Sequence, residues 1–298
     1  MGRTPLGMVC HGGAGNIKDK KGYGEGLAEA LEAGYKLLRQ SADAAHAVVE
    51  AVRLMEDNPV FNCGTGSNLT LDGRAEMDAA VMTQDGRFGG VACISNVRNP
   101  VLVARKVMTE TDHMLLCGEG AGAFARKLGF ESHDPATDRS RARLAKLLET
   151  GESKDYPGFD RMRKLGTVGA VAMDKHGHLA AATSSGGLTG RLAGRAGDTA
   201  IPGAGTYAGP SGAISCTGHG EEIIRLMLAR DVVERMKTLP AQVAVTLALS
   251  EAKRRKAMVG VVGFDARGAV CFGNTTPDMA YGYMVADRLF LFAEGKKG

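Results

Sequence analysis

The sequence changes character abruptly at Thr167, and this change limits the possible folds more than any other feature. Residues 131–165 carry many charges and few large apolar side chains, and they include the turn-forming run 151–158. Residues 167–174 are almost wholly apolar, and a short turn joins them to a second apolar run at 178–183. The pattern predicts a β-hairpin that starts directly after a mobile, solvated linker, whose first part we expect to be a polar helix.

The rest of the chain mixes helical and strand periodicities without an internal repeat. Residues 4–10 predict a strand that runs into a glycine turn at 11–15. Hairpin-linked strands favour antiparallel sheet covered by helices over a regular βαβ array, so the expected fold class is α+β. The periodicities predict helices over 25–38, over 44–55, after Asn99-Pro100, and over 120–128, 219–237 and 239–256, with strand segments over 69–82, 258–265 and 269–274.

Composition places the chain among folded proteins of ordinary charge. Its 298 residues can bury a sizeable core as one or two domains, and a hydrophobic content of 44% excludes disorder over the whole chain. With 37 Lys+Arg against 33 Asp+Glu, the net charge of +4 is too small to indicate a nucleic acid or an anionic membrane as partner. The 42 glycines are many, but they show no period of three, which excludes collagen.

Cysteine usage and the lack of targeting patterns favour a cytoplasmic protein. The cysteines form no C-x-x-C pair and are scattered through apolar stretches, which favours reduced, buried thiols over a disulfide framework. The N-terminus shows no secretory pattern, and no apolar stretch approaches the ~18 residues of a membrane-spanning helix. We therefore expect no membrane partner. The cysteines are Cys10, Cys63, Cys93, Cys117, Cys216 and Cys271.

Two motifs that suggest cofactor or metal sites do not fit their context. Residues 118–123 approximate G-x-G-x-x-A, but no second strand ending in an acidic residue follows, so we interpret them as the start of a helix built from small residues. His176 and His178 stand in or beside a turn without a carboxylate or cysteine cluster at ligand spacing, which argues against zinc. The sequence also contains no P-loop and no G-x-S-x-G elbow.

The pair Gly166-Thr167 at the start of the hairpin is the strongest local candidate for chemistry. A threonine hydroxyl is a poor nucleophile unless a base lies beside it, and a free α-amine on the same residue, with a pKa near ~8, is such a base. The chain can create that amine only by cutting itself before Thr167. Glycine at position 166 permits the strained backbone that exposes its carbonyl to the hydroxyl, although a Gly-Thr pair at a strand start is also typical of a bulge or turn.

A series of motifs, in order along nearly the whole chain, gives this pair its context. They are His11-Gly12-Gly13-Ala14-Gly15 and the segments 61–67, 76–79, 166–174, 182–187, 194–198, 202–205 and 217–221. In order and spacing they resemble the plant-type L-asparaginase and isoaspartyl peptidase (β-aspartyl-peptidase) family. Members of that family are N-terminal-nucleophile hydrolases related to glycosylasparaginase and taspase.

The resemblance implies a mechanism in which the chain cuts itself. Thr167 would be the nucleophile, released by autocleavage of the Gly166–Thr167 bond, and its own amine would shuttle the proton. Asn62 resembles the family's asparagine near the nucleophile, and the Ser185 hydroxyl would hydrogen-bond Thr167. The implied activity is hydrolysis of the side-chain amide of L-asparagine and of β-aspartyl dipeptides.

The resemblance also assigns substrate-binding roles to five residues. Arg195 would bind the substrate α-carboxylate through its planar donors, and Asp198 would pair with the α-ammonium. The Thr217 hydroxyl and the Gly218 N–H would form the oxyanion hole, while Gly220 would allow close backbone approach. Taken without the family context, Arg195 and Asp198 could be a local surface ion pair of small energetic value.

The implied architecture is a single αββα four-layer sandwich. Cleavage would divide residues 1–298 into an α subunit, 1–166, and a β subunit, 167–298, and the family's assembly implies a dimer of αβ units. No cofactor is implied other than a structural sodium ion. Its ligands would be the backbone carbonyls of Met55, Glu56, Asn58, Phe61, Cys63 and Thr65.

Some positions depart from the family's pattern and leave alternatives open. Ser185 stands where the family usually has threonine, so the rotamer-restraining methyl is missing and autocleavage could be slower. Thr199-Ala200 replaces Ser-Pro, and the loop 207–212 is one residue shorter, so the preference between asparagine and isoaspartyl peptides stays open. The alternatives are a glycosylasparaginase-like hydrolase, a taspase-like protease, or an uncleaved, inactive relative that acts as a binding module.

Overall fold

The computed structural model describes residues 6–150 and 166–292, which form a mixed α and β structure with two sheets. The strands are β1 (Gly7–Gly15), β2 (Met77–Thr83), β3 (Phe88–Ile94), β4 (Leu115–Cys117), β5 (Thr167–Met173), β6 (Leu179–Ser185), β7 (Thr206–Gly209), β8 (Gly212–Gly218), β9 (Val259–Asp265), β10 (Val270–Asn274), β11 (Asp278–Val285) and β12 (Arg288–Phe292). The helices are α1 (Lys20–Arg39), α2 (Ala44–Asp57), α3 (Pro100–Glu110), α4 (Gly118–Lys127), α5 (Asp138–Thr150), α6 (Gly220–Leu226), α7 (Leu228–Arg235) and α8 (Ala241–Arg254).

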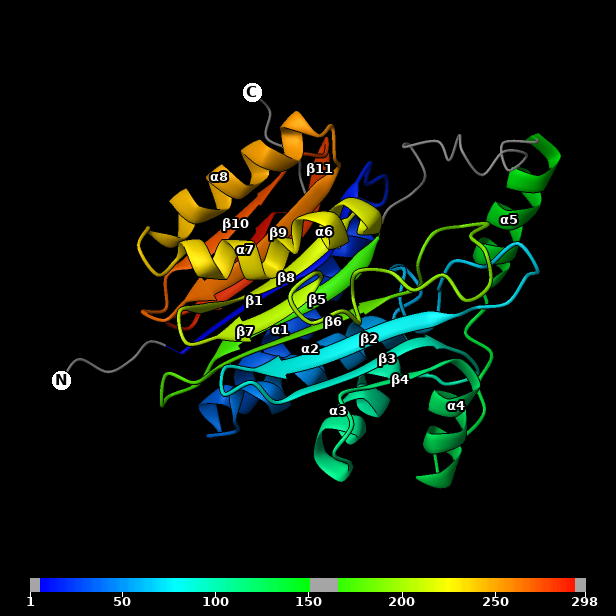
Figure 1. Cartoon of the computed structure of the whole chain (residues 1–298), viewed down its shortest axis with the longest axis horizontal. Helices are drawn as coiled ribbons and strands as arrows, with labels where there is room; N and C mark the ends of the chain where they lie inside the picture. Colours follow the sequence, from blue (N-terminus) through cyan, green and yellow to red (C-terminus); the bar gives the residue numbers. More distant parts are fainter. Residues whose placement is uncertain (1–5, 151–165, 293–298) are drawn as a thin grey trace.

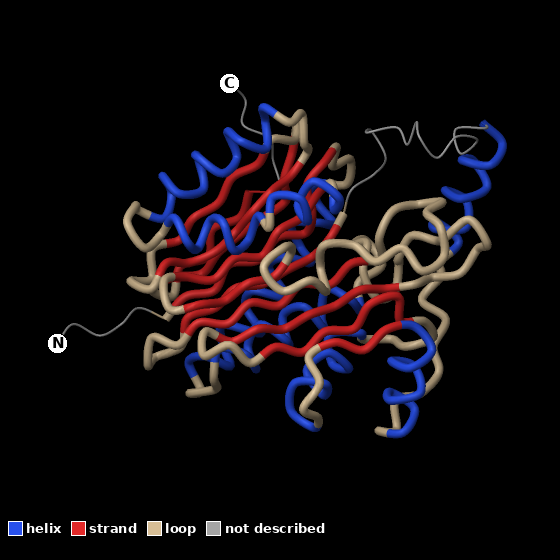
Figure 2. The backbone as a smooth tube through the Cα atoms, viewed as in Figure 1, coloured by secondary structure: helices blue, strands red, loops and turns tan. Residues whose placement is uncertain are grey.

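The larger sheet has eight strands in the order β12-β11-β1-β5-β6-β2-β3-β4, and the smaller has the order β10-β9-β8-β7. Neighbouring strands are antiparallel except β3 and β4, which are parallel. The predicted hairpin, β5 and β6, therefore lies at the centre of the larger sheet between β1 and β2 (Figures 1 and 2). The antiparallel sheet expected from the sequence is confirmed.

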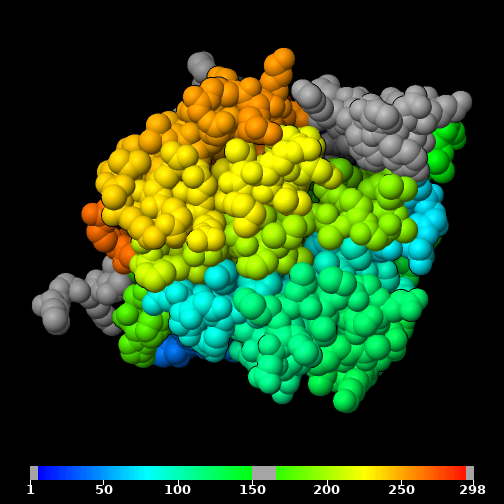
Figure 3. Space-filling view, in the orientation of Figure 1, coloured from blue at the N-terminus to red at the C-terminus, as the bar shows by residue number. Residues whose placement is uncertain are grey.

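The two sheets face each other, and helices cover their outer faces. Strands β1, β5 and β6 contact β8 and β9, whereas α1, α2 and α3 pack on the other side of the larger sheet (Figure 1). Helices α7 and α8 pack on the smaller sheet, and Figure 3 shows their yellow and orange atoms covering it on one face of the molecule. Helix α5 lies at the periphery, apart from the other helices (Figure 1).

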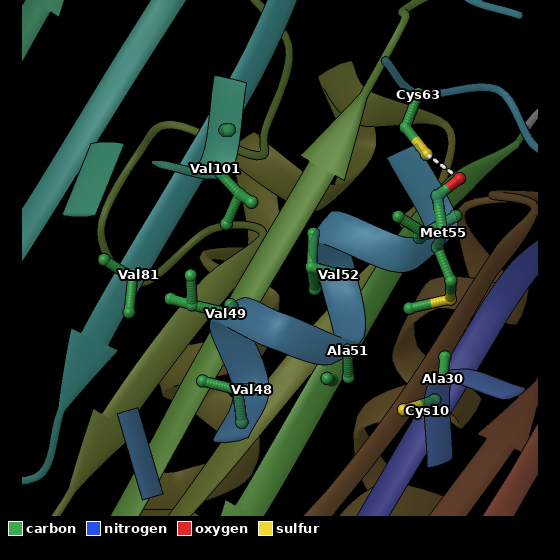
Figure 4. Packing of buried hydrophobic residues seen from close by; sticks show 14 of the residues in the cluster. Cys10, Ala30, Val48, Val49, Ala51, Val52, Met55, Cys63, Val81 and Val101 are labelled. Atoms are coloured by element: carbon green, nitrogen blue, oxygen red, sulfur yellow. Dashed lines mark hydrogen bonds between the residues drawn. The ribbon is translucent and has the colours of Figure 1, made fainter. Parts of the chain in front are cut away.

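The apolar run of β5 follows from its position between these layers. Val168, Ala170 and Ala172 belong to the core beneath α1 and α2, whereas Val171 and Met173 belong to the core between the sheets. A strand buried on both faces has no polar alternation, which is why the sequence reads as continuous apolar residues. Figure 4 shows the helix side of this core, where α2 packs on the sheet.

Two predicted elements differ in the structure. The expected glycine turn at 11–15 is wrong, because β1 continues to Gly15 and pairs with β11 through a bulge between His11 and Gly13. The predicted helix over 219–237 breaks at Met227, whose φ of 46° is left-handed, into α6 and α7. The glycine-rich stretch 184–220, for which the sequence predicts no strand, contains β7 and β8, and β3, β4, β11 and β12 are not predicted either.

The cysteines are free thiols, as expected, but not all are buried. Cys10, Cys63, Cys216 and Cys271 are buried. Cys93 is partly exposed, and Cys117 is exposed because it ends the short edge strand β4 and precedes α4. Within the described ranges, no helix is both long and apolar enough to cross a membrane. The predicted linker covers 131–165. Its first part contains α5, as expected, and 151–165 lies outside the described residues.

Candidate active site

Thr167 is the first residue of β5, and its side chain is buried against the neighbouring strand. The antiparallel register places Thr167 opposite Ser185 of β6, and cross-strand partners project to the same face of a sheet. The Thr167 hydroxyl donates a hydrogen bond of 3.0 Å to the Ser185 hydroxyl, which also accepts from the Gly187 N–H at 3.1 Å. The register thus orients the predicted nucleophile, and Ser185 fills the position expected of it.

Asn62 and Gly13 surround the bond that precedes Thr167. The Asn62 side-chain amide donates to the Gly166 carbonyl at 2.6 Å and to the Gly187 carbonyl at 2.8 Å, while its oxygen accepts from the Asn68 N–H at 2.8 Å. On β1, a side chain at Gly13 would meet the Gly166 Cα at 3.0 Å, and the φ of Gly13 is +118°. A donor on the Gly166 carbonyl polarises the carbon that the Thr167 hydroxyl would attack.

A buried polar network that sequence reasoning missed lies between the sheets behind this bond. His11 Nε2 and the Ser215 hydroxyl are 2.9 Å apart, the Ser215 and Thr183 hydroxyls are 2.8 Å apart, and Thr206 donates to Thr183 at 2.7 Å. Burial lowers the pKa of His11 to about 3, partly offset by the backbone of Thr167, so the ring is neutral. The available signal was the hydroxyls that recur on alternate residues of β6 and β8.

Arg195 and Asp198 lie together beside α6 and are not a surface ion pair. The Arg195 Nη2 and Nε donate to Glu221 Oε1 at 2.8 and 3.0 Å, an interaction the sequence did not suggest. Asp198 is buried, and its Oδ2 has no hydrogen-bond partner among the described residues. Burial raises the pKa of Asp198 to about 7, against the lowering effect of the Arg195 cation. A buried carboxyl group without a full set of partners favours a cationic ligand.

Gly220, Thr217 and Gly218 complete this part of the site. A side chain at Gly220 would stand 2.7 Å from Arg195 Nη2 and 2.9 Å from Asp198 Oδ1, so the two charged groups occupy the space that a Cβ would need. Thr217 is buried at the end of β8, and nothing in the described chain hydrogen-bonds to its hydroxyl. Gly218 has a φ of +127°, and a Cβ there would meet the Met258 carbonyl at 2.3 Å.

The carboxylates of Glu76 and Asp78 hold the loop that carries Arg195 and Asp198. This loop, residues 194–198, is the clamped loop. Glu76 Oε2 accepts from the Gly194 N–H, and Asp78 Oδ2 accepts from the Gly197 N–H, both at 2.7 Å. Asp78 Oδ1 also accepts from the Cys93 N–H at 2.8 Å. The sequence identifies residues 76–79 only as part of a family motif, and it predicts no role for Glu76 or Asp78.

Asp78 also connects the two parts of the site across the larger sheet. It stands opposite Ser185, which itself stands opposite Thr167, so the three residues lie on neighbouring strands. Adjacent strands are ~4.8 Å apart, so Asp78, which holds the loop, lies two strand spacings from Thr167. Thr167, Ser185 and the loop held by Asp78 therefore lie at the same end of the larger sheet.

The loop 55–65, predicted to hold sodium, is closed by its own hydrogen bonds. The Met55 carbonyl accepts from the Cys63 thiol at 3.3 Å (Figure 4), and the Glu56 carbonyl accepts from the Thr65 N–H at 2.8 Å. The Asn58 carbonyl accepts from the Phe61 N–H at 3.2 Å. The Glu56 and Asn58 carbonyls each retain a second lone pair, whereas the Met55 carbonyl also accepts from the Asn58 N–H at 3.3 Å. An oxygen-coordinated cation fits the first two carbonyls better than Met55, and the sodium stays a prediction.

The Glu56 side chain points away from that loop and has a structural role. Its Oε1 accepts from the Val101 N–H at 3.0 Å, in the first turn of α3. Burial raises the pKa of Glu56 to about 8. Asn99, which precedes α3, makes no capping bond of its own, so Glu56 of α2 satisfies the helix start instead. The predicted cation ligand at this position is the Glu56 carbonyl, while Oε1 of its carboxyl group is engaged at the start of α3.

Comparison with known proteins shows the family of the chain. A family model described as asparaginase matches residues 4–293. The chain is 44% identical to the plant-type L-asparaginase of Thermococcus kodakarensis, covering 93% of this chain and 95% of that protein. It is 43% identical to the isoaspartyl peptidase/L-asparaginase of Danio rerio (88% and 86% covered) and 40% identical to the isoaspartyl peptidase of Escherichia coli (93% and 92% covered). The chain therefore belongs to the asparaginase family.

Proposed function

We propose that this protein is an amidohydrolase that cuts itself at Gly166–Thr167 and then hydrolyses the side-chain amide of L-asparagine and of β-aspartyl dipeptides. The single observation that carries the proposal is the arrangement at that bond. The Thr167 hydroxyl is held by Ser185, and the adjoining Gly166 carbonyl accepts a 2.6 Å hydrogen bond from Asn62. The relatives named asparaginase and isoaspartyl peptidase support the same activity.

In the proposed cleavage, the Thr167 hydroxyl attacks the Gly166 carbonyl carbon, and Asn62 donates to the developing oxyanion. The peptide C–N bond then breaks, the nitrogen takes the hydroxyl proton, and an ester joins Gly166 to the threonine oxygen. Water hydrolyses the ester. The products are a carboxylate at Gly166 and a free amine at Thr167, which makes Thr167 its own general base.

In the proposed turnover, the Thr167 amine takes the hydroxyl proton as the oxygen attacks the substrate amide carbon. The Thr217 hydroxyl and the Gly218 N–H donate to the oxyanion, a role that the unpaired buried hydroxyl of Thr217 supports. Arg195 binds the α-carboxylate and Asp198 the α-ammonium. Ammonia or an amino acid leaves with the proton, and water then resolves the β-aspartyl ester.

The finer structural expectations belong to the same proposal. The helix layers outside the two facing sheets support an αββα four-layer sandwich of the N-terminal-nucleophile hydrolase type. Cleavage would give subunits 1–166 and 167–298, and we propose a dimer of these αβ units in the cytoplasm. If sodium binds, backbone carbonyls of the loop 55–65 would hold it and rigidify the segment that carries Asn62.

Incubation of the purified protein tests the proposal. Gels and intact mass should show the fragments 1–166 and 167–298, and the cleaved protein should release ammonia from asparagine and aspartate from a β-aspartyl dipeptide. Thr167→Ala should stay intact and inactive, whereas Thr238→Ala, at an exposed threonine, should behave as the wild type. A chain that stays whole and hydrolyses neither substrate would instead support the uncleaved binding module.

A further inference from the structure

A cavity of about 510 Å³ adjoins the Gly166–Thr167 bond. Gly166 and Asn62 line it, so it adjoins the bond that the proposed cleavage breaks. Its other walls are the loop that follows β1 and one face of α5. Arg195, Asp198 and Thr217 do not line it. The cavity is therefore separate from the α-amino-acid end of the site. That name denotes the region around Arg195 and Asp198, where the α-carboxylate and α-ammonium of the substrate are proposed to bind.

The cavity walls carry positive charge that no carboxylate of the described residues neutralises. Arg139, Arg143 and Lys146 recur at helical spacing on the α5 face, and Lys18 approaches from the loop. None of the four forms an ion pair with a carboxylate in the ranges 6–150 and 166–292. Asp19 is the carboxylate among the lining residues, and it accepts from the Gly22 N–H at 2.9 Å as the cap of α1.

Within the described residues, the guanidinium groups of Arg139 and Arg143 donate to neutral oxygens. Arg139 donates to the Pro59 and Val60 carbonyls at 3.5 and 3.2 Å, and Arg143 donates to the Asn68 side-chain oxygen at 3.3 Å. Burial lowers the pKa of Arg143, and the neighbouring Arg139 cation lowers it further. A carboxylate placed between the two groups would relieve this repulsion through charge-assisted hydrogen bonds.

We propose that this cavity binds the α-carboxylate of the amino acid that leaves from a β-aspartyl dipeptide. This inference rests on the proposed function. The acyl half of such a substrate occupies the Arg195 and Asp198 end, and the scissile amide lies at Thr167. The leaving half extends past Thr167 into the space that Gly166 and Asn62 border. An amino acid leaving group brings one carboxylate to Arg143, whereas the ammonia leaving from asparagine brings none.

The first experiment varies the substrate and leaves the protein unchanged. Cleaved wild-type enzyme is assayed with β-aspartyl-leucine and with its C-terminal amide, which differ only in the carboxylate at issue. We expect kcat/KM to be about tenfold higher for the free acid, as for loss of one charge-assisted hydrogen bond. Equal values for the two dipeptides would overturn the proposal without reference to any variant.

The second experiment varies the cation and uses a matched control on the same helix. Arg143→Gln should lower kcat/KM for β-aspartyl-leucine about tenfold and leave the amide and asparagine unchanged. The control is Arg141→Gln, because Arg141 is exposed, does not line the cavity, and pairs with Asp134 at 2.7 Å. Rates are expressed per cleaved chain, measured by mass, so that altered maturation is not read as altered binding.

The outcomes separate this inference from the proposed function. An equal loss on all substrates in Arg143→Gln would assign the residue to positioning the site and overturn carboxylate binding, as would no loss on any of them. If the wild type hydrolyses none of the substrates, the proposed function fails. Equilibrium binding of β-aspartyl-leucine and its amide to the same protein then decides the cavity's role, with tighter binding of the acid supporting it and equal binding overturning it.

Discussion

The two ends of the site are held in opposite ways. At the Arg195 and Asp198 end, buried carboxylates of the β2 region accept backbone N–H groups of the loop, and even the space for a Cβ is filled by the charged groups. At the α5 end, Arg139 and Arg143 border an open cavity, and their hydrogen bonds within the described residues go to neutral oxygens. One end is assembled before any ligand arrives, and the other presents charge to solvent.

This difference matches what each end would meet. Every proposed substrate carries the same α-carboxylate and α-ammonium, so a rigid end loses no binding energy to reorganisation. Leaving groups differ in size and charge, and long cationic side chains on a peripheral helix can adjust to them. The α-amino-acid end should therefore be intolerant of small changes, and the α5 end should affect only substrates that carry a charge there.

The largest expected effect comes from releasing the clamped loop. Asp78→Ala leaves the Gly197 and Cys93 N–H groups without their acceptor, and unpaired buried donors cost ~1–3 kcal/mol each. We expect kcat/KM for asparagine to fall about 100-fold, mainly through KM, because Arg195 and Asp198 lose their fixed positions. Steady-state kinetics per cleaved chain measure this.

The control for this variant is Asp72→Ala, since Asp72 precedes β2 and pairs with exposed Arg74. Full affinity in Asp78→Ala would show that the loop keeps its conformation without the clamp. The proposed contrast between the two ends would then be wrong.

The second effect is a pH dependence confined to the α-amino-acid end. Burial raises the pKa of Asp198 to about 7, so below that pH the carboxyl is protonated and cannot pair with the substrate ammonium. We expect kcat/KM for asparagine to rise with pH through about 7. Below that pH, protonation of Asp198 adds a loss of roughly tenfold per unit to the loss already caused by protonation of the Thr167 amine. Asp198→Asn should remove this part of the pH dependence of kcat/KM and keep the part due to the Thr167 amine.

Binding at the α5 end should not depend on pH in this way, because guanidinium groups stay charged throughout the pH range of the assay. The preference for a free-acid dipeptide over its amide should therefore be constant between about pH 5 and 9. A preference that instead followed the Asp198 titration would mean that the two ends are coupled. The pH profile of each substrate, recorded on one enzyme preparation, provides this check.

A third, smaller effect comes from filling the space between Arg195 and Asp198. Gly220→Ala places a methyl group within 2.7 Å of Arg195 Nη2, so both charged side chains must shift. We expect KM for asparagine to rise about tenfold, because Arg195 and Asp198 are displaced. Thermal stability should change little, because the atoms that must move are the ends of side chains and not backbone. Gly120→Ala is the matched control, because Gly120 also lies in the first turn of a helix and a Cβ there meets nothing within 4 Å.

The sequence predicted the residues of the α-amino-acid end but not what holds them. Thr167, Arg195 and Asp198 belong to motifs that are short in sequence and can be identified without the fold. The partners are far away in the chain: Glu221 binds Arg195, and Asp78 binds Gly197, across separations of 26 and 119 residues. Such contacts depend on how two sheets meet, which no local periodicity reports.

The α5 end was missed for a different physical reason. Arg139 and Arg143 look like the solvated face of a polar helix, and only the cavity beside Gly166 distinguishes them from Arg141. The strands of the glycine-rich stretch 184–220 could not be predicted from periodicity. A strand such as β8 is covered on both faces by other layers, so it accepts glycine, serine and threonine and shows no alternation of polar and apolar residues.

The smallest effect tests whether the nucleophile itself is as rigid as the clamped loop. Ser185 accepts hydrogen bonds from the Thr167 hydroxyl and the Gly187 N–H, but it lacks the methyl group that restrains a threonine rotamer. Ser185→Thr should therefore accelerate cleavage of Gly166–Thr167 about two- to threefold, corresponding to a rotamer restraint of ~0.5 kcal/mol, with kcat per cleaved chain unchanged. Gel densitometry over time measures it, with Ser250→Thr on exposed α8 as control. An unchanged rate would mean that the strand register alone already fixes the hydroxyl, so that the nucleophile belongs with the preassembled end of the site.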